Sequence, residues 1–172
     1  MNKTRKIVTI GLLVSLGLIL HFVESMVPMS YIVPGAKLGL ANIVSLIGLV
    51  LFGFNGGLLI LLLRVFLGSI MAGTFLTINF YLSFAGGLLG YIIMAVIYLS
   101  FRNKFSLVGI SVAGAAFHNL GQIIVAYFII SNPGIFFYLP YLILLSVPTG
   151  IGVGLVSYFS LNNLPGNVIR RI

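Results

Sequence analysis

Charged residues are so scarce in this chain that they restrict it to one class of fold. Of 172 residues, nine are Lys or Arg and Glu24 is the single acid, whereas 60% are hydrophobic. A soluble domain of this length needs far more charge to keep its surface hydrated. Apolar stretches long enough to cross the ~30 Å hydrocarbon core recur along the chain. The sequence therefore predicts an all-α integral membrane protein, and its 21 glycines suit helices that pack closely in lipid.

We predict six transmembrane helices in a single domain that covers residues 1–172. Short loops join the helices, and no internal repeat is visible. The first apolar run resembles a signal peptide, but at about 20 residues it is long enough to span, and no small-x-small cleavage site follows it. Asn55-Gly56-Gly57 predicts the turn between the second and third helices. The predicted spans are 7–26, 37–54, 58–72 (with a start as early as 56), 79–100, 107–130 and 142–161.

The positions of the cations predict the orientation of the chain. Seven of the nine lie on one side of the six predicted spans: Lys3, Arg5, Lys6, Arg102, Lys104, Arg170 and Arg171. Because cytoplasmic loops carry an excess of Lys and Arg, we expect both termini in the cytoplasm and the chain in the plasma membrane. Orientation thus explains the net charge of +8, so nucleic acid binding is not expected. It does not explain Lys37, on the outside, or Arg64, within a span.

The shortage of acids excludes most catalytic chemistry. Paired carboxylates for acid and base catalysis, Asp-rich magnesium diphosphate sites and Ser-His-Asp arrangements all need acids that this chain lacks. With no cysteine, neither a disulfide nor a thiolate metal or redox site is possible. Two histidines in separate spans supply too few metal ligands. We therefore predict a protein that is not an enzyme and that holds no metal or cofactor.

Two charged residues are predicted to lie at membrane depth. Arg64 is expected ~12 Å along the third span, where a guanidinium costs at least ~3 kcal/mol and must face protein or water. It either clamps the bundle by bonding to carbonyls of a neighbouring span or faces an anionic ligand. Glu24 is expected ~26 Å along the first span, near the outer rim. Lys37 is then its expected partner, either in a loop latch or in a substrate site.

A polar stripe is predicted in the fifth span. His118, Gln122 and Asn119 fall at about 0°, 40° and 100° around a helix, with Gly114 and Gly121 beside them. A single buried histidine is usually a hydrogen-bonded core residue. Two neighbouring amides on the same face favour contact with a substrate instead.

Further polar and aromatic residues are expected near the outer ends of the spans. Asn42 and Asn79 would join the residues above in lining a cavity that opens outward. The turn at Pro34-Gly35, in the outside loop 27–36, would bring Lys37 to the rim of that cavity. The aromatic residues Phe136, Phe137, Tyr138 and Tyr141 form either a lid or an interfacial belt.

Gly11 and Ser15 in the first span form a small-xxx-small pair. Such pairs let another helix approach closely, so this pair is a candidate docking surface for a partner protein. The pattern is common in membrane helices and is not specific alone.

Three stretches of the sequence resemble the Gx transporter family, also labelled heptaprenyl diphosphate synthase component I. They are Pro34-Gly35-Ala36-Lys37-Leu38-Gly39-Leu40-Ala41-Asn42-Ile43-Val44, Ser83-Phe84-Ala85-Gly86-Gly87 and His118-Asn119-Leu120-Gly121-Gln122. Arg64, Glu24 and Gly109-Ile110-Ser111 match the same pattern. The six-span layout is in turn similar to the S components of energy-coupling factor (ECF) transporters.

This resemblance implies a membrane subunit that captures a vitamin-like or isoprenoid- or quinone-related molecule from outside. It also implies a membrane T component and two ATPase subunits as partners. In S components the docking face of the first span usually carries alanines, from which Gly11 and Ser15 depart. The older synthase label implies a different role, a non-catalytic scaffold for prenyl diphosphate or quinone synthesis, because no aspartate is present to hold magnesium diphosphate. A stand-alone secondary transporter is disfavoured by the lack of a repeat and of an embedded acid suited to proton coupling.

Overall fold

All the regular secondary structure in the described part of the chain is helical. The structure is a computed structural model that describes residues 2–26, 39–101 and 104–164. Five of its helices are long and apolar enough to cross a membrane, which confirms the predicted class of all-α membrane protein. Its elements are α1 (Lys3–Met26), α2 (Asn42–Met71), α3 (Ile78–Ser100), α4 (Leu107–Ile130), the short 3-10 helix η2 (Pro133–Tyr138) and α5 (Leu139–Asn162).

The bounds of α3 and α4 agree to within one residue with the predicted spans 79–100 and 107–130. Local caps explain the limits of α4: the Ser106 hydroxyl accepts a hydrogen bond from the Gly109 amide at 3.1 Å, and Ser131 ends the helix with a left-handed φ of 54°. Helix α5 begins earlier than predicted and includes Pro140 in its first turn. Proline is tolerated there because the first helical amides have no partner within the helix.

The predicted turn at Asn55-Gly56-Gly57 is wrong. These residues are helical, and the break lies at Gly53, whose φ of 72° and ψ of −169° are accessible in practice only to glycine. Most of both predicted spans, 37–54 and 58–72, therefore lies in the single element α2. Helix α2 starts at Asn42 rather than at residue 37, because Gly39 adopts a φ of 72° before it. Lys37 itself lies outside the described residues.

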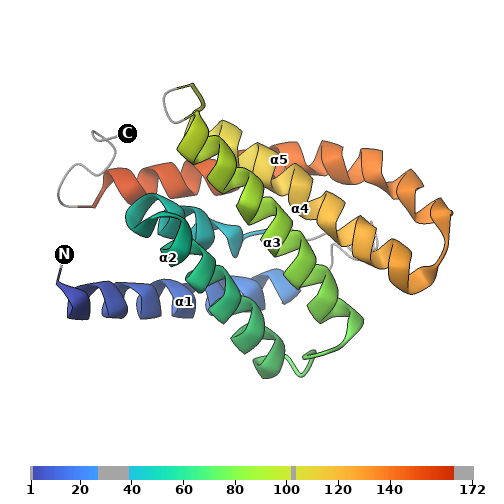
Figure 1. Cartoon of the computed structure of the whole chain (residues 1–172), viewed down its shortest axis with the longest axis horizontal. Coiled ribbons are helices and arrows are strands. Elements are labelled where there is room, and N and C mark those ends of the chain that lie inside the picture. The colour runs from blue at the N-terminus through green and yellow to red at the C-terminus, as the bar shows by residue number, and fades with distance from the viewer. Residues whose placement is uncertain (1, 27–38, 102–103, 165–172) are drawn as a thin grey trace.

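Gly53 folds α2 back on itself as a helical hairpin. A Cβ on Gly48 would lie 3.2 Å from the Gly57 Cα, and a Cβ on Gly57 would lie 2.8 Å from the Leu49 amide nitrogen. Only glycines permit such an approach, and Figure 1 shows α2 reversing its direction. Segment 42–52 is ~16 Å long and segment 54–71 is ~27 Å long at ~1.5 Å per residue. The first segment is therefore about half as long as the ~30 Å hydrocarbon core.

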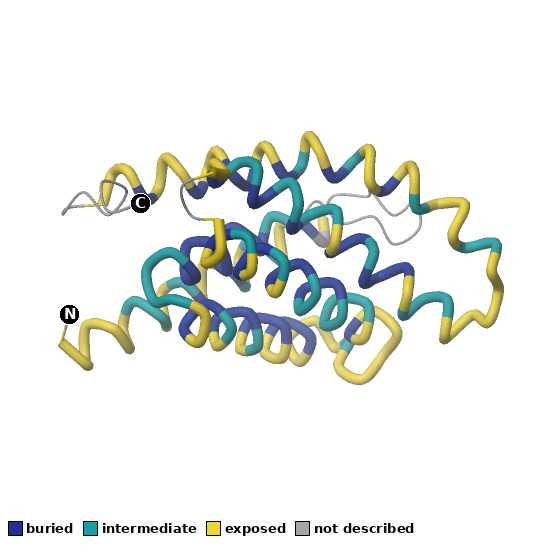
Figure 2. Tube along the Cα trace, turned by 45° about the horizontal axis from the view of Figure 1, so that its top comes forward, coloured by how far each residue is buried: buried dark blue, intermediate teal, exposed yellow. Residues whose placement is uncertain are grey.

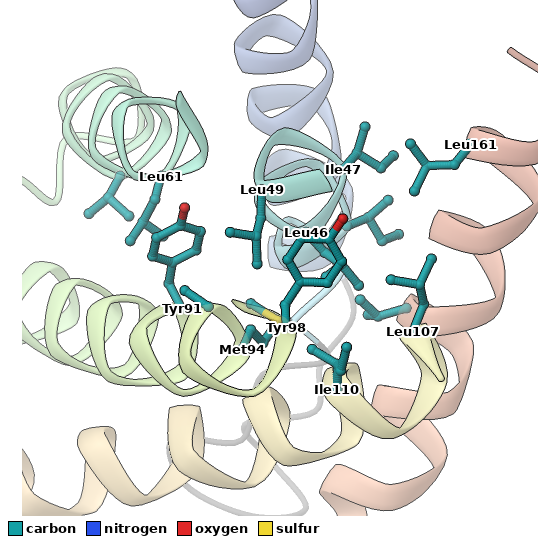
Figure 3. Close-up of a cluster of buried hydrophobic side chains, with 14 of the residues drawn as sticks. Leu46, Ile47, Leu49, Leu61, Tyr91, Met94, Tyr98, Leu107, Ile110 and Leu161 are labelled. Carbon is teal, nitrogen blue, oxygen red and sulfur yellow. The ribbon is translucent and has the colours of Figure 1, made fainter. Parts of the chain in front are cut away.

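The helices pack side by side around an apolar core. The start of α1 and the end of α5 lie at the same end of the molecule (Figure 1). Buried positions gather where the helices meet, and exposed positions form the outer surface (Figure 2). Apolar side chains from α2, α3, α4 and α5 converge in the core shown in Figure 3, among them Leu46, Leu49, Leu61, Tyr91, Met94, Ile110 and Leu161.

Candidate functional site

Arg64 holds the two halves of the α2 hairpin together. Its Nη2 donates a hydrogen bond to Asn42 Oδ1 at 2.7 Å, and its Nε donates to Ser45 Oγ at 3.2 Å. All three side chains are buried, and Asn42 and Ser45 belong to segment 42–52 while Arg64 belongs to segment 54–71. Of the two predicted alternatives for Arg64, this geometry supports the clamp. The acceptors are side-chain oxygen atoms rather than backbone carbonyls.

Ser45 is a functional candidate that the sequence reasoning missed. It is fully buried and lies three residues after Asn42, so both face the same side of their helix. This spacing of three residues is the sequence signal that could have identified Ser45 as a partner of Asn42. Serine is common in membrane helices, however, and only the hairpin brings Arg64 to it.

Glu24 fixes the chain that leads into α2. Its Oε1 accepts a hydrogen bond from the Gly39 amide at 2.6 Å, and the carboxylate is buried. Its negative charge also attracts the Arg64 guanidinium. The single acid and the membrane-embedded cation thus act on one another. The predicted latch between Glu24 and Lys37 involves a residue outside those described.

Glycines on α3 bring α4 close enough for its polar stripe to touch α3. A Cβ on Gly86 would lie 2.7 Å from Gln122 Cγ and 2.8 Å from the His118 carbonyl oxygen. The neighbouring Gly87 faces α2, where a Cβ would lie 3.9 Å from Arg64 Nη2. Helix α3 therefore lies between two polar groups, with His118 and Gln122 on the side of Gly86 and Arg64 on the side of Gly87. We call Asn42, Ser45, Arg64, His118 and Gln122 together the polar layer.

Gln122 has the most unusual environment in the polar layer. The residue is only 3% exposed, and neither its Nε2 nor its Oε1 has a hydrogen-bond partner within the described structure. An unsatisfied buried donor or acceptor costs about 1–3 kcal/mol, so native proteins rarely keep one without a reason. His118, one helical turn away, is buried beside it.

Two of the predicted site residues lie away from the polar layer. Asn119 points to α5, where its Nδ2 donates to the Leu142 carbonyl oxygen at 2.8 Å, so this amide joins two helices. Asn79 is exposed in the first turn of α3. The aromatic residues of η2 and early α5 are largely exposed, and Phe137 reaches 83%, as an interfacial belt requires.

The pair Gly11 and Ser15 lies on the exposed side of α1. A Cβ on Gly11 would meet nothing within 4 Å among the described residues, and Ser15 Oγ donates to the Gly11 carbonyl oxygen at 3.0 Å. The opposite side of α1 contacts α2 through Gly17, where a Cβ would lie 2.8 Å from Val44 and 3.4 Å from Arg64 Cδ. Helix α1 therefore packs one face against the bundle, and no other residue in the described part of the chain covers the predicted docking pair.

A protein-family comparison covers most of the chain. A family model described as "Heptaprenyl diphosphate synthase component I" matches residues 13–160. No curated protein and no solved structure matches the chain. The matched segment contains the whole polar layer and Ser15, and it begins just after Gly11.

Proposed function

The chain belongs to the heptaprenyl diphosphate synthase component I family, and from that premise we propose that it is the substrate-binding S subunit of an ECF-type importer. It captures a small vitamin-like, isoprenoid- or quinone-related molecule from outside. The protein is not an enzyme on this proposal. The family description itself names one component of a synthase.

The polar layer is the observation that carries this proposal. Polar side chains inside a membrane are costly and mark ligand or ion pathways when they face the interior of a bundle. Here five of them come from α2 and α4 on either side of Gly86 and Gly87, and the Gln122 amide has no hydrogen-bond partner among the residues that the structure describes. A helix bundle that served only as an anchor needs none of these groups.

The α2 hairpin supports a six-span topology on this proposal. Its two segments together with α1, α3, α4 and α5 make six helical passages, and α1 starts at the end of the bundle where α5 finishes (Figure 1). Lys3, Arg5 and Lys6 at the start of α1 support the part of the proposal that places both termini in the cytoplasm and the protein in the plasma membrane.

The uncovered face of α1 is the proposed docking surface for a membrane T component. Gly11 and Ser15 allow a partner helix to approach, and the large apolar side chains around them remain exposed. The sequence has no Walker motif, so ATP hydrolysis falls to two partner ATPases.

A transport assay tests the proposed function. Cells that express the partner subunits should accumulate substrate with the wild-type protein and lose retention with His118→Ala and Asn119→Ala, because the first changes the polar layer and the second loosens α4 from α5. Thr9→Ala, in the first half of α1, is the control. Unchanged substrate retention in both variants would remove the polar stripe from the site.

A second candidate follows from the family description. A component of a prenyl diphosphate synthase would act as a non-catalytic membrane scaffold that binds a synthase subunit or a lipid intermediate. Affinity purification under mild detergent separates the two candidates. Recovery with ATPases supports the importer, whereas recovery with a soluble prenyl synthase and never with ATPases supports the scaffold.

A further inference from the structure

Arg64 already has partners within the protein for part of its hydrogen-bonding capacity and for its charge. Two of its nitrogen atoms bond to Asn42 and Ser45, and Glu24 supplies the opposing negative charge. The buried Arg64 and Glu24 therefore compensate one another within the described structure. A ligand with a net charge would add an uncompensated charge at membrane depth, which is unfavourable.

The Gln122 amide, in contrast, carries no charge and lacks hydrogen-bond partners within the described structure. It is neutral, it is 97% covered by protein, and both ends of the amide are unsatisfied in the described structure. A primary amide offers an acceptor oxygen and donor N–H groups side by side. A partner that satisfies both at once must present a donor and an acceptor at the same spacing.

On the basis of the importer proposed above, we propose that the substrate is electrically neutral where it meets the polar layer and presents an amide-like edge to Gln122. Lactams, imides, ureas and carboxamides on flat rings have such an edge, with an N–H beside a carbonyl. Quinones offer acceptors alone, and prenyl diphosphates carry a strong negative charge. A site that is built around a neutral amide and a compensated arginine disfavours both, which narrows the substrates proposed above to the vitamin-like class.

Equilibrium binding to the full-length protein in lipid nanodiscs tests this inference. The probes are nicotinamide and uracil for the amide edge, nicotinate as the carboxylate counterpart of nicotinamide, 1,4-naphthoquinone for acceptors alone, and farnesyl diphosphate. We expect at least about tenfold tighter binding of nicotinamide than of its carboxylate counterpart. Gln122→Met should abolish this preference, and Thr9→Ala should keep it.

The thermal stability of Gln122→Met supplies a readout that does not depend on the probes. Without a probe, this variant removes an unsatisfied amide, so the midpoint of unfolding should rise by about 2–4 °C. A fall in the midpoint would show that Gln122 is already satisfied in the empty protein and would overturn the inference.

The binding experiment distinguishes a failure of the amide-edge proposal from a failure of the proposed substrate capture. Tighter binding of a carboxylate, the quinone or the diphosphate overturns the amide edge and leaves substrate capture intact. No binding of any probe, together with no retained small molecule in native mass spectrometry of the purified protein, overturns substrate capture and the amide edge with it.

Discussion

Removing the Arg64 side chain tests the idea that the α2 hairpin is held by a buried charge network. Arg64→Met keeps the length of the side chain but leaves Asn42 and Ser45 without their donors and Glu24 without its cation. Each of the two charge-assisted hydrogen bonds contributes about 1.5–3 kcal/mol. Breaking a buried pair from one side costs about 3–5 kcal/mol because the other charge stays unpaired. We therefore expect a loss of roughly 4 kcal/mol in the free energy of unfolding, or about 10 °C in the unfolding midpoint.

A double-mutant cycle with Glu24→Gln separates this network from simple loss of packing. If Glu24 and Arg64 stabilise one another, the double variant Glu24→Gln/Arg64→Met should be more stable than the sum of the two single effects predicts. The coupling should be about 1–2 kcal/mol, within the range found for residues that share a network. Thermal unfolding of the purified proteins in one detergent provides all four values. Additive effects within about 0.5 kcal/mol would refute the electrostatic part of the reasoning.

Two glycine predictions follow from the same helices. Gly53→Ala should destabilise the protein by about 1–3 kcal/mol, because a φ of 72° disfavours any side chain, although a Cβ there would meet none of the described atoms within 4 Å. Gly152→Ala, with equal space around it in a regular helix, should be neutral or stabilising in the same unfolding assay. Gly90→Ala should push α3 from α4, because its Cβ would lie 2.6 Å from a backbone oxygen of α4, whereas Gly109→Ala meets only contacts beyond 3.6 Å. Equal melting temperatures within either pair of variants would contradict the corresponding account.

The bounds of α3 and α4 were predictable because polar residues flank two uniformly apolar runs. Arg102, Asn103 and Lys104 separate them, and Ser106 is a favourable cap for the second. The turn within α2 was not predictable from composition, since residues 53, 56 and 57 are all glycines. Packing decides between them: Gly57 lies against Leu49 and the Tyr91 hydroxyl, while Gly53 takes the strained backbone angle.

The part of the candidate site that lies on one helix was predictable from the sequence. The contacts between residues of two different segments were not. The helical period places His118 and Gln122 on one face, and both indeed contact Gly86. The same period places Asn119 about 100° away, which is enough to direct it to α5 instead. The bonds from Arg64 to Asn42 and Ser45 depend on the hairpin, so no reading of separate spans reveals them.

The turn at Gly53 has a consequence for how the chain is inserted into a membrane. Without that reversal, α2 would be a single ~45 Å rod that crosses the bilayer once, and every later helix would run in the opposite direction. Lys104 and the end of α5 would then emerge on the face opposite Lys3, against the preference of cations for the cytoplasm. On the proposed six-span topology, one glycine in a backbone conformation that other residues avoid thus determines on which side of the membrane each later helix ends.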